Sequence, residues 1–141
     1  MFLEIRFLRR GDDLTLERVA PNVFDGPIVE KWTREFLADA RHHLVVGLDE
    51  GLVVGMVSAV HYVHPDKAPQ LWINEVGVAP SHHRRGIARQ LLDAMLEHGR
   101  SLGCTEAWLG TEETNVAANE LYKRAGGKAE PFVLYSFPLG G

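Results

Sequence analysis

The stretch that decides the fold covers residues 74–88 and reads NEVGVAPSHHRRGIA. Its first residues continue a β-rich run that starts at Leu71, and Pro80 ends that strand. After a basic, glycine-containing loop, apolar residues recur at helical spacing over residues 87–102. A strand, a turn and a helix start in this order place free N–H groups, which carry partial positive charge, at the end of the loop. The stretch therefore predicts an anion-binding loop.

The composition of this loop suits a pyrophosphate. Gly86 lets a phosphate approach the main chain, and Arg84, Arg85 and Arg89 add full positive charges. The sequence lacks the Gly-Lys-Ser/Thr of a P-loop and the three glycines of the nicotinamide fingerprint. The alternative interpretation is a solvated basic helix start that Ser81 caps. The loop alone leaves both interpretations open.

Hydrophobic periodicity predicts the elements around the loop. Strands are expected where apolar and polar residues alternate, and helices where apolar residues recur every three or four positions. Asp49-Glu50-Gly51 is the predicted turn of a hairpin, with Gly51 at positive φ, and Gly103 is the predicted C-cap of the helix after the loop. Strands are predicted over residues 3–9, 43–48, 51–63, 71–78, 105–110 and 131–138, and helices over 12–20, 28–40, 87–102 and 115–125.

The order of these elements predicts the fold class. It reads β-α-α-β-β-β-α-β-α-β and combines hairpin strands with β-α-β crossovers. Hairpins pair strands antiparallel, whereas crossovers require parallel neighbours. We therefore expect a single α/β (α+β) domain over residues 1–141, in which helices flank a mixed central sheet.

Composition narrows the partners of this domain. The 141 residues carry a formal net charge of −4 and contain no run of basic residues, which disfavours nucleic acid and favours a cationic small molecule. The longest apolar run, residues 52–60, is far shorter than the ~20 residues that cross a bilayer. A single cysteine, Cys104, and an N-terminus without a secretory apolar stretch predict a cytoplasmic protein that is not in a membrane.

Two motifs carry a resemblance to a known family. The run His83-x-x-Gly86-x-Ala88 resembles the cofactor motif of the Gcn5-related N-acetyltransferase superfamily, Gln/Arg-x-x-Gly-x-Gly/Ala, with His83 in place of Gln or Arg. The run from Asn115 to Gly126 is similar to the final motif of that superfamily, although Gly127 replaces its usual apolar residue. The resemblance implies acetyl-CoA as the cosubstrate. The cofactor-binding residues that it implies are Val76, Gly77, Val78, His83, Arg84, Arg85, Gly86, Ile87, Ala88, Arg89, Asn115 and Tyr122.

Within the superfamily, the chain looks most like the type I aminoglycoside 3-N-acetyltransferases. The pointers are residues 22–26, the loop 64–69, the strand 73–78 and the loop 111–114. This resemblance implies acetylation of the 3-amino group of an aminoglycoside, an activity that confers antibiotic resistance. The superfamily also acetylates polyamines, other small amines and protein amines, so these acceptors stay open.

Acetyl transfer to an amine sets the chemistry that the site must perform. An ammonium must lose a proton, and the departing thiolate must gain one. Glu75 is the candidate base, with a partly buried ion-pair partner as the alternative. Tyr122 is the candidate acid that the resemblance implies, with core packing as the alternative. Asn115 is first of all the expected N-cap of the last helix.

A cationic acceptor requires carboxylates around Glu75. The candidates are Asp25 together with Glu112 and Glu113, although a glutamate-rich loop tip can also be merely solvated. No metal is expected, because adjacent histidines in a strand point to opposite faces and no cysteine completes a set of ligands. A domain that binds acyl-CoA as a sensor without transferring it is the second class of function. A homodimer is left open.

Overall fold

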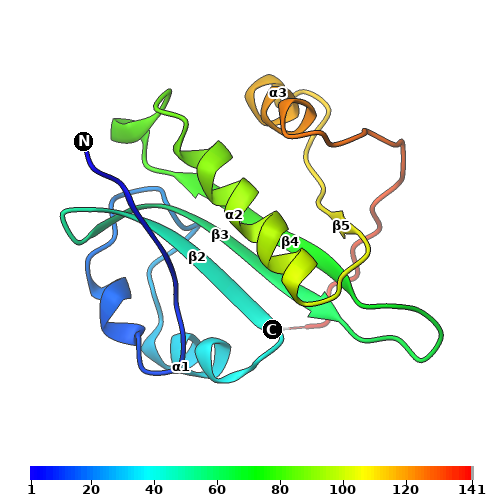
Figure 1. Ribbon diagram of the computed structural model, residues 1–141, viewed down its shortest axis with the longest axis horizontal. Helices are drawn as coiled ribbons and strands as arrows, with labels where there is room; N and C mark the ends of the chain where they lie inside the picture. The colour runs from blue at the N-terminus through cyan, green and yellow to red at the C-terminus, as the bar shows by residue number, and fades with distance from the viewer. Residues whose placement is uncertain (141) are drawn as a thin grey trace. The chain divides into compact units, whose positions relative to one another are not determined.

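The computed structural model describes residues 1–140, and five strands form one mixed sheet in the order β1-β2-β3-β4-β5 (Figure 1). The first four strands pair antiparallel with their neighbours, and β5 pairs parallel with β4. This arrangement confirms the predicted mixed sheet. The strands are β1 (Glu4–Phe7), β2 (His42–Asp49), β3 (Leu52–Tyr62), β4 (Gln70–Val78) and β5 (Ala107–Trp108).

The chain divides into two compact units, which are described separately. The first, Met1–Gly110, contains the whole sheet with four helical segments, and the second begins at Thr111 and contains α3. None of the helices in the described residues is long and apolar enough to cross a membrane. The helical segments are η1 (Asp13–Glu17), α1 (Glu30–Ala38), η2 (Pro80–His82), α2 (Ile87–Ser101) and α3 (Val116–Arg124).

Helix α2 covers one face of the sheet, and the loop between η1 and α1 lies against the other (Figure 1). On the α2 face, a Cβ on Gly55 would lie 3.0 Å from the side chains of Ile87 and Leu91. On the opposite face, a Cβ on Gly77 would overlap the carbonyl oxygen of Val23. Glycine at both positions therefore lets a helix and a loop approach the sheet closely, which sets the thickness of the core.

A bulge in β4 changes which face its side chains occupy. Ser58 of β3 pairs with Glu75, but Ala59 pairs with Ile73, so Asn74 has no partner. Leu71, two residues before Ile73, packs against Gly99 of α2. If side chains simply alternated along β4, Glu75 would lie on the α2 face together with Leu71 and Ile73. The extra residue, Asn74, shifts Glu75 to the opposite face, which the η1–α1 loop covers.

Three predicted turns and caps are confirmed. Gly51 has a φ of +80°, and Glu50 before it also adopts a left-handed conformation, as a tight hairpin turn requires. Gly103 has a φ of +84° directly after the last turn of α2. The side chain of Asn115 accepts a hydrogen bond of 3.1 Å from the backbone N–H of Ala118, so it caps α3.

Three predicted elements differ from the structure. The first predicted helix is a 3₁₀ segment of five residues, η1, and the strand predicted at 105–110 shrinks to two residues. The strand predicted at 131–138 is absent. Its apolar side chains are exposed, including Phe132 at 66% and Leu134 at 80%, and a strand forms only where a neighbour pairs with its backbone groups. The alternating sequence supplies the propensity but no partner.

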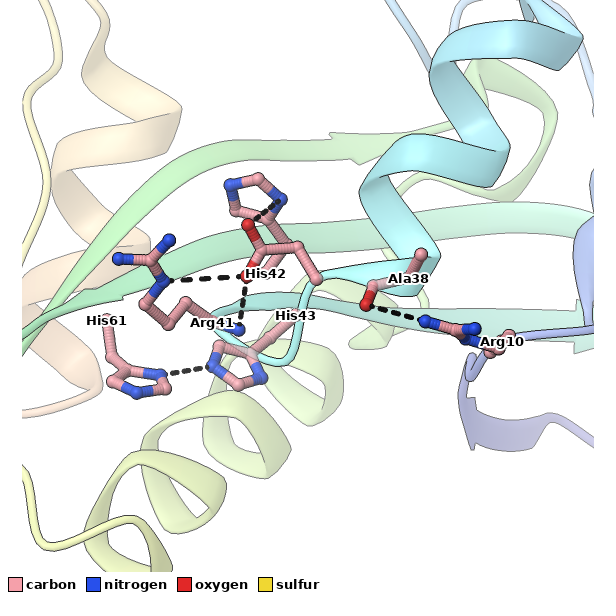
Figure 2. Close-up of polar contacts among 7 residues, drawn as sticks. Arg10, Ala38, Arg41, His42, His43 and His61 are labelled. Atoms are coloured by element: carbon pink, nitrogen blue, oxygen red, sulfur yellow. Dashed lines mark hydrogen bonds and ion pairs between the residues drawn. The ribbon is translucent and has the colours of Figure 1, made fainter.

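Three histidines meet between the sheet and α2, at the end of the sheet remote from the basic loop. His43 of β2 places its Nε2 2.8 Å from Nδ1 of His61 on β3, and its Nδ1 3.0 Å from Nε2 of His98 on α2. Figure 2 shows the first of these contacts, with the two rings facing each other. Burial, with smaller effects from the neighbouring imidazoles, lowers the pKa of His43 from 6.5 to about 4. The folded protein thus keeps this imidazole neutral.

We predict that this histidine makes stability depend on acid. Between pH 6.5 and about 4, His43 binds a proton in the unfolded chain but stays neutral in the folded chain. The contribution of His43 to the free energy of unfolding therefore falls as the pH falls through this window. The variant His43→Asn lacks the group. The unfolding free energy of the wild type minus that of the variant should therefore shrink from pH 7 to pH 4 in urea titrations. A pH-independent difference would contradict the prediction.

We also predict that Gly77→Ala destabilises the fold. The added methyl group meets the main chain of Val23, which cannot move as a side-chain end can, so the cost should be about 1–3 kcal/mol. Gly26→Ala, in the same loop as Val23, meets nothing within 4 Å and should change stability by less than about 0.5 kcal/mol. Chemical denaturation of both variants measures the difference, and equal stabilities would show that the loop does not pack on Gly77 in solution.

Candidate active site

Glu75 is the half-buried carboxylate of β4 that the bulge turns toward the η1–α1 loop. The hydroxyl of Ser58, on the neighbouring strand, donates a long hydrogen bond of 3.5 Å to Glu75 Oε1. Ser58 is only 5% exposed. The candidate base is thus held in β4 directly after the bulge, next to a buried hydroxyl. In the described residues it forms no ion pair.

The surroundings of Glu75 strengthen it as a base. Burial raises the pKa of its carboxyl group above 4.5, and the nearby carboxyl group of Asp25 raises it further. The hydroxyl of Ser58 acts in the opposite direction and has the smallest effect. Asp25 lies in the loop between η1 and α1, fifty residues before Glu75 in the chain. The structure therefore brings together two of the four predicted acceptor-binding carboxylates.

An acidic cavity lies on the Asp25 side of this pair. It has a volume of about 690 Å³, and every residue that lines it comes from residues 13–33. Four carboxylates line it, and among its lining residues there is no lysine or arginine. Trp32 on α1 is close in sequence to these residues and is 66% exposed, but it does not line the cavity. The cavity wall is formed mainly by η1 and the loop after it. The four acidic residues are Asp13, Glu17, Asp25 and Glu30.

The edge of β4 beyond β5 is open. Strand β5 pairs only with Leu71 and Trp72, so β4 continues past it from Ile73 to Val78 without a strand on that side. Every second residue along this edge offers an N–H and a C=O that no strand bonds. The segment 76–78, predicted to contact the cofactor through its backbone, belongs to this open edge. An extended molecule that carries amide groups can bond there as a strand does.

The basic loop (His83–Gly86) connects η2 to α2 and exposes its side chains. The first helical hydrogen bond runs from Gln90 N to Gly86 O at 3.1 Å, so the N–H groups of residues 87–89 have no helical partner. Gly86 has a φ of +75°, and a Cβ there would meet nothing within 4 Å. The loop thus ends in open space beside free donors, which fits an anionic group such as a pyrophosphate.

The three arginines of the loop region differ in whether their side chains already contact another residue of the protein. Arg84 forms no ion pair with any described residue, and its φ of +64° is left-handed. Arg85 contacts the sulfur of Met1 at 3.7 Å. Arg89 is bonded to Asp93, one turn further along α2, at 3.0 Å and 3.1 Å. The ring of His83 bonds to the carbonyl oxygen of Val78 through Nε2 at 2.9 Å, so this side chain fastens the loop to the end of β4.

The second unit carries the remaining predicted residues. Burial raises the pKa of the half-buried Tyr122 phenol on α3, which keeps it protonated. Gly127 N donates to Tyr122 O at 2.9 Å, and a Cβ on Gly127 would lie 2.9 Å from the same oxygen, which explains glycine where an apolar residue is usual. Glu112 and Glu113 are exposed, and their carbonyl oxygens accept hydrogen bonds from the side chain of Asn119 at 3.1 and 3.5 Å.

Other reactive groups do not form a second centre. Within residues 1–140, no three histidine, cysteine or carboxylate side chains are arranged to hold a metal ion. Burial raises the pKa of the Cys104 thiol, which disfavours the nucleophilic thiolate.

The comparison with known protein families decides the relationship. The family model for acetyltransferases of the GNAT family matches residues 12–127, which covers most of the chain. The chain belongs to the acetyltransferase (GNAT) family. The mixed sheet and the fold class predicted from the sequence agree with this membership.

The curated relatives of this GNAT chain include a streptothricin acetyltransferase and an aminoglycoside acetyltransferase. Streptothricin acetyltransferase of Streptomyces lavendulae is 34% identical over 89 residues, which cover 63% of this chain and 45% of that protein. Aminoglycoside N(6')-acetyltransferase type 1 of Salmonella typhimurium is 27% identical over 85 residues, which cover 57% of this chain and 59% of that protein. The chain thus spans about half the length of these relatives.

A solved structure shares the fold over nearly the whole chain. It is an aminoglycoside acetyltransferase from an uncultured soil metagenomic sample, in complex with sisomicin. The TM-score is 0.84 at 18% identity, with 99% of this chain and 97% of that chain covered. This similarity shows the GNAT fold.

Sequence reasoning missed three features of the site. The bulge at Asn74 depends on the register between β3 and β4, which the sequence of β4 alone does not reveal. Ser58 looked like an ordinary strand residue. The acidic cavity arises because η1 and the loop after it curl around a space, although the excess of acidic over basic residues from 13 to 30, four against one, was a visible signal.

We predict that Asp25→Asn lowers the pKa of Glu75. The substitution keeps the shape of the side chain but removes the negative charge that disfavours ionisation of Glu75. Glu30→Gln is the matched control, because Glu30 lines the same cavity without acting on the pKa of Glu75. Carbon-detected NMR titration of the Glu75 carboxyl group measures both. If Asp25→Asn leaves this pKa where it is in the wild type, the two carboxyl groups are not neighbours in solution.

Proposed function

We propose that this chain transfers an acetyl group from acetyl-CoA to a primary amine of an aminoglycoside. The observation that carries the proposal is that Asp25, on the wall of an acidic cavity, lies near enough to Glu75 to raise its pKa and so strengthen it as a base. A base prepared in this way suits removal of a proton from an ammonium group. An acidic cavity suits a substrate that carries several such groups.

Glu75 is the proposed general base. Amines of aminoglycosides are mostly protonated at neutral pH and have no lone pair for attack. A carboxylate whose pKa is raised by burial accepts the proton more readily than an exposed one, directly or through a water molecule. The neutral amine then attacks the thioester carbonyl carbon. Because Glu75 is itself a residue of β4, its position relative to the open edge of that strand is fixed.

The cofactor is proposed to lie along the open edge of β4 and against the basic loop. The amides of its pantetheine arm would bond the backbone of Val76, Gly77 and Val78, and its pyrophosphate would accept from the N–H groups of residues 84–89. When bound, the cofactor supplies the activated acetyl thioester. Arg84 and Arg85 would add charge from exposed positions, and His83 would act by holding the loop to Val78.

Tyr122 is the proposed general acid. Because burial keeps its phenol protonated, it can donate a proton to the departing thiolate. Asn115 supports this role by capping the helix that carries Tyr122, and by resemblance it also contacts the cofactor. These roles come from the family motif and from the environment of each residue within the second unit.

The acceptor is proposed to occupy the acidic cavity. Four carboxylates without a lysine or arginine favour a ligand with several positive charges. A mono-amine would leave most of these charges unpaired, which favours an aminoglycoside over a small mono-amine. Glu112 and Glu113, exposed in the second unit, are kept as proposed acceptor-binding residues on the basis of the sequence. Acetylation is proposed at the 3-amino group, whereas the named aminoglycoside relative acts at N(6').

An acceptor panel tests the proposal. Full-length protein is incubated with acetyl-CoA and gentamicin, kanamycin, streptothricin, spermidine or a lysine peptide, and release of free thiol is followed. We expect saturable turnover with an aminoglycoside, and NMR of the product should show the acetyl group on the 3-amino nitrogen. Acetylation at 6' would correct the position alone. Turnover only of spermidine or the peptide would show that the proposed substrate class is wrong. Binding of acetyl-CoA without turnover of any acceptor would indicate a sensor.

Two variants test the catalytic roles in the same assay. Glu75→Gln keeps the shape and loses basicity, so kcat should fall by ~10²–10⁴ while the Kd of acetyl-CoA stays the same. Tyr122→Phe should also lower kcat without weakening cofactor binding. The matched control is Glu30→Gln, which removes one cavity charge and should raise KM for the acceptor more than it lowers kcat. Near wild-type kcat in Glu75→Gln would assign that residue a structural role.

A further inference from the structure

His82 is a nearly buried histidine beside the basic loop that the proposed chemistry does not use. Its side chain is 12% exposed. Nε2 lies 2.8 Å from Oδ2 of Asp49, and Nδ1 lies 2.7 Å from the hydroxyl oxygen of Ser81. Both ring nitrogens are therefore engaged. The ring connects η2 to the end of β2, a contact across 33 residues of sequence.

Asp49 belongs to a hairpin that is bonded to other parts of the first unit. Asp49 is the last residue of β2 and pairs with Leu52 across the hairpin. On the hairpin turn, Glu50 O accepts a hydrogen bond of 3.1 Å from the side chain of Arg18. Main-chain bonds of 2.9 Å also join Val53 to Arg18 and to Ala20. The hairpin is thus bonded to the segment directly after η1, and His82 joins η2 to this hairpin.

The basic loop is held at both ends, and between them the ring of His83 bonds to the carbonyl oxygen of Val78. Before it, Ala79 is 1% exposed and its N–H donates to Val54 O at 2.8 Å. After it, Ile87 is 2% exposed in the core. The four residues between His82 and Ile87 are exposed, and Arg84 adopts a left-handed φ of +64° that costs free energy in any residue other than glycine. Such a conformation persists only where its surroundings hold it.

We propose that His82, held between Asp49 and Ser81, is a positioning residue that sets the backbone of the basic loop for the pyrophosphate of the cofactor. The inference rests on the proposed function, since it assumes that this loop binds acetyl-CoA. A loop that is already ordered loses less conformational entropy when an anion binds to its N–H groups. His82 itself touches no cofactor atom in this role and acts through the main chain of His83–Gly86.

Equilibrium binding of CoA tests the role. Isothermal titration calorimetry should show that His82→Ala raises the Kd of CoA about tenfold. His82→Gln should restore binding to within about threefold, because its side-chain amide can donate to Asp49 from nearly the position of Nε2. The control Glu97→Gln removes an exposed ion pair with Arg100 on α2, 3.0 Å long, and should leave the Kd unchanged. A wild-type Kd in His82→Ala would overturn the proposal.

A truncated cosubstrate distinguishes a positioning role of His82 from a general loss of structure in the His82→Ala variant. S-acetylpantetheine lacks the pyrophosphate, so His82→Ala should use it with the KM and kcat of the wild type. Hydrogen exchange of the free variant should be faster only at the amides of residues 83–88. Equal losses with acetyl-CoA and S-acetylpantetheine, or faster exchange throughout β2 and β3, would assign His82 a merely structural role. If the wild type binds no CoA at all, the proposed function itself is wrong.

Discussion

The single unpaired residue in β4, Asn74, determines what the rest of the site can be. Without it, Glu75 would lie under α2 among the apolar side chains of the core, where a charged carboxylate is costly. With it, Glu75 reaches the opposite face, next to Ser58 and Asp25. The same change of face brings Gly77 under the carbonyl of Val23, so the η1–α1 loop rests on β4. The bulge thus places the candidate base and the cavity wall together.

Backbone groups dominate the part of the site proposed for the cofactor. The open edge of β4, the free N–H groups at the start of α2 and the left-handed residues Arg84 and Gly86 are all properties of the main chain. Side chains such as His82 and His83 act on this region by holding it in place. This division explains how the loop can depart from the family motif at His83 and still present the same donors. Having His83 where the family has Gln or Arg removes none of these main-chain N–H groups.

The sequence predicted most of the fold because its strongest signals are local. The stripe of apolar residues in α2, the turn at Gly51 and the caps at Gly103 and Asn115 depend on neighbours within a few positions. The bulge at Asn74 and the contact of Glu75 with Asp25 depend on the register and on a loop fifty residues away, which periodicity does not encode. The strand predicted at 131–138 was wrong for a related reason. Alternation shows that a segment can be a strand, but only a partner makes it one.

The chain of three histidines has a consequence for where protons reside in the fold. A neutral imidazole carries one N–H, so His43 can donate to only one neighbour and must accept from the other. If its proton is on Nε2, His98 donates to His43 and His43 donates to His61, and the opposite tautomer reverses both bonds. The tautomers of residues on β2, β3 and α2 are therefore coupled. One proton shift in the middle ring reorients the hydrogen bonds of all three elements.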